Sequence, residues 1–297
     1  MQPVENLRIE QTQKRVRGFI GGDVVFDTVH ARLIWEVPYY PAYYIPAEDV
    51  HATLVHSEED KASDRLGDAE CFDVKTGDTL VHNAARRYPV SPTEELRDLI
   101  RFEWRALTEW LEEDEPIYTH PRDPYKRIDI LTSSRHVEVK LKDVTVADSR
   151  QPRILFETTL PPRYYLPLTD VRMDLLRPSE KTSHCAYKGM ANYWSVEIDG
   201  ELHEDVVWIY RTPLPEAQKV TGLAAFFNER VDLYVDGRLQ PRPQLRSAGR
   251  RPNPELPGAN SSFRALPTRA CCPHLACLLC ICKDEHLTVW AKWGAAE

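Results

Sequence analysis

Residues 16–55 read VRGFIGGDVVFDTVHARLIWEVPYYPAYYIPAEDVHATLV, and residues 137–176 read VEVKLKDVTVADSRQPRILFETTLPPRYYLPLTDVRMDLL. The two stretches align without a gap and share 12 identities over 40 positions, whereas unrelated stretches would share about 2 to 3. In the first copy these identities are Val16, Val25, Asp27, Arg32, Glu36, Pro41, Tyr43, Tyr44, Pro46, Asp49, Val50 and Leu54. A structural unit was therefore duplicated at a spacing of 121 residues. This spacing is far longer than the roughly 20 to 50 residues of solenoid repeats, so the sequence predicts two globular domains.

The domain limits follow from composition. The segment from His120 to Arg127 holds two prolines in a polar run, which is typical of a linker. We place the first repeat at residues 14–131 and the second at 132–243. Residues 244–297 are rich in Pro, Arg, Ser and Gly and show little periodicity, which predicts a disordered tail. Five of the seven cysteines lie in this tail, but their spacing matches no recognised zinc finger, and we predict no metal site.

Both copies begin with a pattern typical of a β-hairpin. Val16–Ile20 precedes a Gly-Gly-Asp turn, and Val137–Leu141 precedes a Lys-Asp turn. Further short strands are expected at residues 32–36, 50–55, 153–157, 171–176, 192–198, 206–210 and 230–235. Helix is sparse: one short amphipathic turn or helix is expected after Pro92, with a shorter counterpart at 215–222. The sequence predicts a mostly β, antiparallel fold with one or two short helices.

Charge and composition narrow the classes of partner. The net charge is −8, and because residues 244–297 carry seven basic against four acidic residues, residues 1–243 carry −11. A body this acidic repels phosphate backbones, which disfavours general nucleic-acid binding. We see neither a secretory signal nor an apolar run long enough to cross a membrane. Cys71 and Cys185, which we assign to corresponding places in the two copies, are too few for a disulfide framework, so we expect a soluble, cytoplasmic protein.

Two blocks of the second copy carry a family resemblance. Tyr164-Tyr-Leu-Pro is followed by Asp170-Val-Arg-Met-Asp174, and His184-Cys-Ala-Tyr-Lys-Gly189 is followed by Asn192-Tyr-Trp. Together they resemble the family called domain of unknown function 427, in its tandem form. The resemblance implies a β-tent fold in each repeat and a nucleotidyltransferase-like label, with no established activity and no known cofactor. The first copy departs from both blocks, so any activity is expected in the second.

Three groups of residues are candidates for a ligand site. Asp170, Arg172 and Asp174 would share one face of a strand, either to grip a charged group or as a solvated salt-bridge ladder. In the second block, Lys188 and Gly189 suit an anion and Cys185 suits a thiolate nucleophile, although Cys185 is equally suited to be a small buried filler. The third group is a set of aromatic residues that either lines a flat pocket or forms core, and it includes Tyr165, Tyr187 and Trp194.

Glutamates and arginines also recur between the copies. Glu36 and Glu157 end matching strands, as Arg32 and Arg153 begin them, which indicates a structural pair that holds the strand. The function that these features favour is binding of a small molecule or nucleotide-type ligand in the second repeat. The alternatives are a nucleotidyltransferase-like enzyme and a non-catalytic module that binds a protein partner.

Overall fold

The computed structural model describes residues 7–64 and 66–243, and the side chains of 58–64 are not described. Within this part, the strands of the first repeat are β1 (Ile9–Gln11), β2 (Val16–Ile20), β3 (Asp23–Thr28), β4 (Arg32–Val37), β5 (Tyr40–Pro46), β6 (Thr53–Asp64), β7 (Gly67–Thr76), β8 (Thr79–Arg87), β9 (Leu99–Phe102), β10 (Glu109–Glu112) and β11 (Glu115–Pro116). Those of the second repeat are β12 (Ile128–Thr132), β13 (Val137–Leu141), β14 (Val144–Ser149), β15 (Arg153–Glu157), β16 (Arg163–Leu166), β17 (Leu176–Cys185), β18 (Gly189–Ile198), β19 (Glu201–Tyr210), β20 (Ala224–Phe226), β21 (Asp232–Val235) and β22 (Arg238–Leu239). The chain is mostly β, as predicted.

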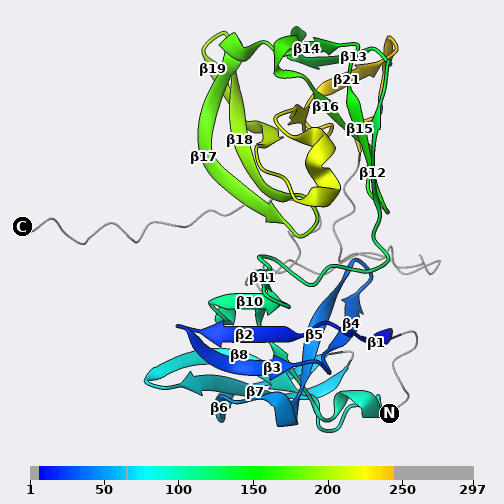
Figure 1. The fold of residues 1–297 in the computed structure, drawn as a ribbon. Helices are drawn as coiled ribbons and strands as arrows, with labels where there is room; N and C mark the ends of the chain where they lie inside the picture. The colour runs from blue at the N-terminus through cyan, green and yellow to red at the C-terminus, as the bar shows by residue number, and fades with distance from the viewer. Residues whose placement is uncertain (1–6, 65, 244–297) are drawn as a thin grey trace, which may run out of the picture.

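The two repeats have the same sheet topology. Each has a seven-stranded sheet, in the order β1-β4-β5-β9-β8-β7-β6 and β12-β15-β16-β20-β19-β18-β17, and a four-stranded sheet, β11-β10-β2-β3 and β22-β21-β13-β14. Figure 1 shows the first repeat in blue to cyan and the second in green to yellow, with the linker between them. Because strand order and pairing match throughout, β1 corresponds to β12 and every later strand to the one eleven places on. The duplication read from the sequence is thus also a duplication of structure.

Each large sheet buries both of its faces. One face packs on the small sheet through the main apolar core, which in the second repeat includes Val137, Leu166, Val196 and Leu233. The other face carries a second cluster that includes Tyr165, Tyr193 and Trp208 and is covered by a short 3-10 helix. Side chains alternate between these faces along each strand. The second face is the one that carries the site described below.

Helical structure in residues 7–64 and 66–243 consists of short 3-10 turns. They are η1 (Ala47–Asp49), η2 (Glu94–Leu96), η3 (Trp104–Ala106), η4 (Leu168–Asp170), η5 (Met173–Leu175) and η6 (Pro215–Val220). The relative lengths predicted for the helices were wrong, since η6 spans six residues and its first-repeat counterpart η2 only three. Of the strand predicted at 50–55, residues 53–55 are confirmed as part of β6, whereas the strand predicted at 171–176 was largely wrong. Val50 and Val171 each form a single bridge, and the strands begin only at Thr53 and Leu176.

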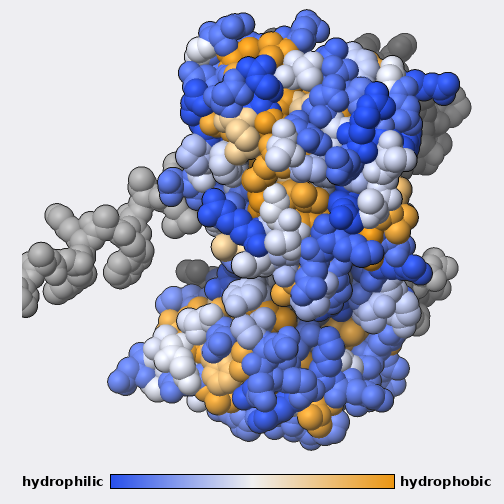
Figure 2. Space-filling view, turned by 45° about the horizontal axis from the view of Figure 1, so that its top comes forward, coloured by the Kyte–Doolittle hydropathy of each residue, from blue (hydrophilic) through white to orange (hydrophobic). Residues whose placement is uncertain are grey.

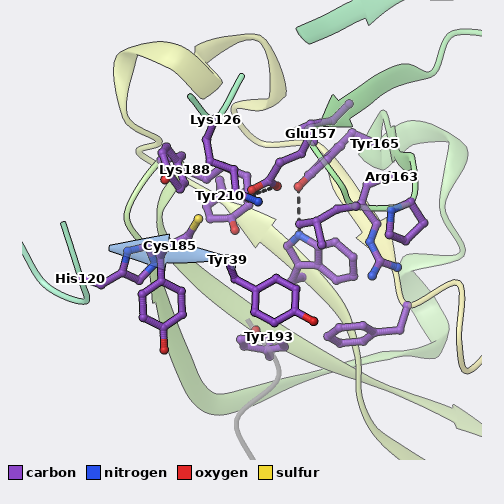
Figure 3. Close-up of a pocket in the computed structure, with 17 residues that line it drawn as sticks. Tyr39, His120, Lys126, Glu157, Arg163, Tyr165, Cys185, Lys188, Tyr193 and Tyr210 are labelled. Atoms are coloured by element: carbon purple, nitrogen blue, oxygen red, sulfur yellow. Dashed lines mark hydrogen bonds and ion pairs between the residues drawn. The ribbon is translucent and has the colours of Figure 1, made fainter. Parts of the chain in front are cut away.

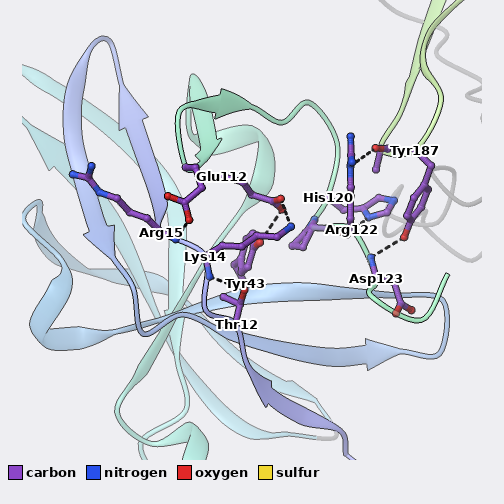
Figure 4. Close-up of polar contacts among 12 residues, drawn as sticks. Thr12, Lys14, Arg15, Tyr43, Glu112, His120, Arg122, Asp123 and Tyr187 are labelled. Atoms are coloured by element: carbon purple, nitrogen blue, oxygen red, sulfur yellow. Dashed lines mark hydrogen bonds and ion pairs between the residues drawn. The ribbon is translucent and has the colours of Figure 1, made fainter. Parts of the chain in front are cut away.

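The linker joins the two repeats through buried hydrogen bonds (Figure 4). Trp35 Nε1 of the first repeat donates to Asp123 Oδ2 at 3.1 Å. Asp123 N donates to Tyr187 OH of the second repeat at 2.7 Å, as Figure 4 shows. Arg122 donates to the carbonyl of Ala186 at 2.8 Å and also pairs with Glu216. The linker therefore fixes the second repeat against the first. The boundary that we predict between residues 131 and 132 falls within β12, which pairs with β15.

At one pair of facing core positions, the two repeats divide the side-chain volume differently. Gly18 lies opposite Phe26 in the β2–β3 hairpin, whereas Val139 lies opposite Ala147 in the equivalent hairpin. A Cβ on Gly18 would lie 2.4 Å from both the Phe26 ring and Leu107 Cδ2, so these two side chains together require glycine at this position. In the second repeat, a valine and an alanine occupy the same two positions.

We expect Gly18→Val to destabilise the protein by about 1–3 kcal/mol through overpacking against Phe26. The double variant Gly18→Val/Phe26→Ala, which copies the second repeat, should lose less stability than the sum of the two single changes, by about 1 kcal/mol or more. Urea unfolding of the four proteins measures the coupling. Strictly additive losses would contradict this account of the packing.

His120 should make the repeat interface sensitive to acid. Its ring stacks on Tyr40 with ring centroids 4.3 Å apart. Burial is the main cause that holds the pKa of His120 below its ordinary value of 6.5. Lys126 also lowers this pKa, whereas Pro121, Asp123 and Glu157 raise it by less. Because the unfolded chain then binds a proton more readily, this contribution to stability is present above pH 6.5 and is lost as the pH falls below it. His120→Phe keeps a ring on Tyr40 and should flatten the decline in unfolding free energy between pH 6.5 and pH 5. An unchanged slope would show that His120 does not control it.

Candidate functional site: an aromatic pocket in the second repeat

A pocket lies on the second face of the large sheet of the second repeat, next to the first repeat (Figure 3). The space in it that the centre of a water molecule can occupy is about 60 Å³. Its walls are formed by Tyr39, Tyr40, His120, Lys126, Leu155, Glu157, Leu160, Pro161, Arg163, Tyr165, Cys185, Tyr187, Lys188, Tyr193, Trp208, Tyr210 and Phe227. The turn between β4 and β5 of the first repeat supplies Tyr39 and Tyr40, so the site is completed by both repeats.

Aromatic rings form most of the pocket wall. Trp208 packs against Phe227 with ring centroids 4.6 Å apart, and Phe227 stacks on Tyr193 at 6.2 Å. The Tyr165 ring stands perpendicular to Trp208, whose indole Nε1 donates to Tyr165 OH at 3.1 Å. These rings come from neighbouring strands β16, β18 and β19 and from the residue after β20. Such a wall offers flat apolar surfaces at fixed angles, which suits a planar ring.

A buried ion pair lies among these rings. Lys188 Nζ lies 2.6 Å from Glu157 Oε2, and both side chains are 9% exposed. The backbone fixes Lys188, because its carbonyl accepts a hydrogen bond from Leu214 N at 3.1 Å and because Gly189 follows it with a φ of +90°. This φ lies in a region that L side chains rarely adopt, which favours glycine at this turn. The turn thus aims the ammonium group at the end of β15.

Two further cations line the pocket. Arg163 forms a bidentate pair with Glu229, with N–O distances of 2.8 and 2.7 Å, and its guanidinium lies 5.7 Å from the centre of the Trp208 ring. Lys126 Nζ donates to two neutral oxygens, Thr158 O at 3.2 Å and Thr159 Oγ1 at 3.0 Å. The lining carries three cationic side chains against one carboxylate, in contrast to the acidic body of the protein.

The first repeat fills the equivalent space with its own side chains. Pairing registers equate Tyr44 with Tyr165 and Arg101 with Ala225. Arg101 Nε lies 2.5 Å from Glu36, the counterpart of Glu157, and its Nη1 lies 2.6 Å from Glu103. The second repeat has only a methyl group where the first repeat has this guanidinium. The hollow therefore belongs to the second repeat.

The same registers identify the other exchanges. The first repeat has Arg86 where the second has Trp208, and Glu103 where the second has Phe227. Arg86 Nη2 lies 2.9 Å from Glu103 Oε1. Leu66 takes the place of Lys188, because Gly67 and Gly189 both begin the strand after the turn. We had assigned Cys71 and Cys185 to corresponding places, and this was wrong. Cys71 pairs with Arg86 as Tyr193 pairs with Trp208, so its counterpart is Tyr193.

Of the predicted site residues, the structure brings four into the pocket: Tyr165, Cys185, Tyr187 and Lys188. Gly189 lies behind Lys188 and lines a neighbouring cleft that shares His120 and Cys185 with the pocket. Trp194 points the other way and packs on the main core, because it alternates with Tyr193 along β18.

The acidic block lies elsewhere. We expected Asp170, Arg172 and Asp174 on one strand face, but the chain makes two 3-10 turns there, η4 and η5. Asp170 accepts a hydrogen bond from Ser149 at 2.6 Å, and Arg172 forms an exposed bidentate pair with Asp174. None of the three lines the pocket. Their contacts are local, and Arg172 and Lys188 do not converge.

The expectation of a Glu–Arg structural pair was also wrong. Glu36 bonds to Arg101 and Tyr44, and Glu157 bonds to Lys188. Arg32 instead donates to the His30 carbonyl and Arg153 to Thr132. Glu157 is thus a pocket group, which its position at a strand end next to a Pro/Tyr-rich corner did not reveal.

The wall also contains residues that the sequence did not indicate. Tyr39 and Tyr40 belong to the first repeat, and His120 and Lys126 belong to the linker. No spacing or motif connects them with the second repeat, because only the docking of the two repeats brings them together. The cysteines of residues 244–297 lie outside the described residues.

Two features, a membrane-spanning helix and a cluster of metal ligands, are absent from the described residues. No helix there is long and apolar enough to cross a membrane. No group of three or more His, Cys, Asp or Glu side chains there is arranged to hold a metal ion.

A comparison with protein families gives a match over both repeats. The model described as "Domain of unknown function (DUF427)", which bears the short name NTP_transf_9, matches residues 8–113 and again residues 129–237. No curated protein matches the chain. The nucleotidyltransferase label comes only from the short name of the model. Since the two matches cover well over half of the chain, the protein belongs to the family of domain of unknown function 427, in a tandem arrangement.

Proposed function

We propose that the second repeat binds a small molecule that consists of a planar ring and an acidic group. The observation that carries the proposal is the pocket itself, in which aromatic rings from neighbouring strands surround a space lined by Lys126 and Lys188. The ring of the ligand would lie against Trp208, Tyr193 and Phe227. This chemistry includes nucleotide-type ligands, and it requires no metal.

The charges support an acidic group on the ligand. Glu157 neutralises Lys188, and Glu229 neutralises Arg163. Lys126 Nζ donates to the neutral oxygens of Thr158 and Thr159, so its positive charge favours an anion at the pocket rim. A cationic ligand would meet three cationic side chains and only one carboxylate in the lining.

The two alternative functions find less support in the geometry. A nucleotidyltransferase needs carboxylates that hold metal ions close to the nucleotide, whereas Asp170 and Asp174 lie outside the pocket and bond to Ser149 and Arg172. For a protein-interaction module, exposed apolar side chains should gather on one face. The large exposed apolar side chains are spread over strands of both repeats and over loops, and Figure 2 shows separate hydrophobic patches on both lobes.

Ala225→Arg should close the pocket. The change places in the second repeat the arginine that fills the first, so the new guanidinium should reach Glu157 and occupy the ligand space. A screen of ring-bearing acids by thermal shift should find ligands that stabilise the wild type by about 2.7 kcal/mol at about 100 times their dissociation constant. The same ligands should not stabilise Ala225→Arg.

Asp174→Asn is the matched control, because Asp174 lies in the second repeat but outside the pocket. It should respond to the ligands as the wild type does. If no ring-bearing acid shifts the wild type, the proposed function is wrong; if Ala225→Arg still responds, the ligand binds elsewhere.

Lys126→Gln should weaken binding of the acidic ligand about tenfold, since a charge-assisted hydrogen bond of about 1.4 kcal/mol would be lost. Titration calorimetry measures the change. Lys142→Gln removes an equal charge from an exposed pair with Glu201, and it should leave the affinity unchanged. Equal losses in both variants would indicate only a long-range charge effect.

A further inference from the structure

We infer that Lys188 forms a reversible imine with an aldehyde or ketone group carried by the ring ligand. This inference rests on the proposed function and adds a covalent step to it. It assigns the carbonyl class of the ligand and gives the buried ion pair a chemical role.

The position of the amine supports this step. Lys188 is 8% exposed, its Nζ lies at the pocket wall, and the aromatic rings around it exclude most water. Imine formation releases water and is favoured where little water surrounds the bond. The backbone hydrogen bond from Leu214 holds the base of the side chain, so the amine is already placed for attack.

The cation that pairs with the recurrent glutamate differs in chemistry between the two repeats. Glu36 is neutralised by the guanidinium of Arg101, which does not lose its proton in proteins. In the second repeat the arginine is replaced by Ala225, and Glu157 is neutralised by a lysine from a different strand junction. Leu66 occupies the matching position in the first repeat. As the partner of the recurrent glutamate, a lysine is thus present in the second repeat, which has the hollow site, and an arginine in the first. A lysine can become a neutral nucleophile.

Glu157 completes the chemistry. At 2.6 Å from Nζ, its carboxylate can take a proton from the Lys188 ammonium and leave a neutral amine. The nitrogen lone pair forms a bond to the carbonyl carbon, whose oxygen receives that proton from Glu157. The nitrogen then loses a second proton to the carboxylate, the C–O bond breaks, and the hydroxyl leaves as water with the proton from Glu157. Carbonyl compound and amine give imine and one water, with no oxidant or reductant.

Trapping with 4-formylbenzoate tests the inference. This probe carries a ring, an acidic group and an aldehyde, and sodium cyanoborohydride reduces its imines to stable secondary amines. The full-length protein should gain one reduced probe, which peptide mapping should place on Lys188 at a rate at least about tenfold above that of any other lysine. Benzoate, which has the ring and the acid but no carbonyl, should compete.

Two variants make the test specific. Lys188→Arg retains a cation beside Glu157 and should abolish the fast adduct. Glu157→Gln retains the size of the side chain but removes the proton acceptor, and it should slow trapping by about 10²-fold. Circular dichroism and thermal melting confirm that each variant is folded; if Glu157→Gln does not fold, Lys188→Arg alone decides the question.

The outcomes separate this inference from the proposed function. If benzoate binds in the pocket but Lys188 is labelled no faster than surface lysines, the imine is wrong and the binding function stands. If Lys188 is labelled rapidly but ring-bearing acids do not compete, the reactive lysine stands and the proposed ligand class is wrong. If neither binding nor labelling occurs, both are overturned.

Discussion

A glutamate near the end of one strand, with a side chain that is 27% exposed in the first repeat and 9% in the second, is the constraint on which the second face of each large sheet depends. Glu36 and Glu157 close β4 and β15, and each lies among tyrosines and apolar side chains. A carboxylate in such surroundings needs a cation and hydrogen bonds, because an uncompensated buried charge costs about 3–5 kcal/mol. Each repeat must therefore bring a cationic side chain to the same point.

The two repeats meet this requirement from different strands, and the choice decides whether a cavity exists. Arg101 on β9 reaches Glu36 from within the sheet and fills the space in front of it. Lys188 reaches Glu157 from the turn between β17 and β18, and Ala225 leaves the space empty. Trp208 and Phe227 then face the hollow where Arg86 and Glu103 form part of the first repeat's ion-pair network. A duplicated fold has thus produced one packed site and one open site.

The filled repeat still contributes to the open one. Its β4–β5 turn places Tyr39 and Tyr40 at the pocket, and Asp123 of the linker bonds to Trp35 on one side and to Tyr187 on the other. The shape of the pocket in the second repeat therefore depends on the position of the first. The duplication need not have produced two binding sites to be retained, because one repeat can serve as the wall of the other.

The sequence by itself determined the duplication, the two hairpins that open the repeats and the family, because these depend on local periodicity and on motifs of nearby residues. It also indicated Lys188 and Tyr165, since one lies in a motif and the other in a recurrent Tyr-Tyr pair. Only the tertiary structure decided that Glu157, 31 positions from Lys188, is its partner, and that Asp170 and Arg172 are not. Pairing between distant strands sets which side chains meet, and the docking of the repeats adds Tyr40 and His120 to the site. Local sequence patterns carry no record of either.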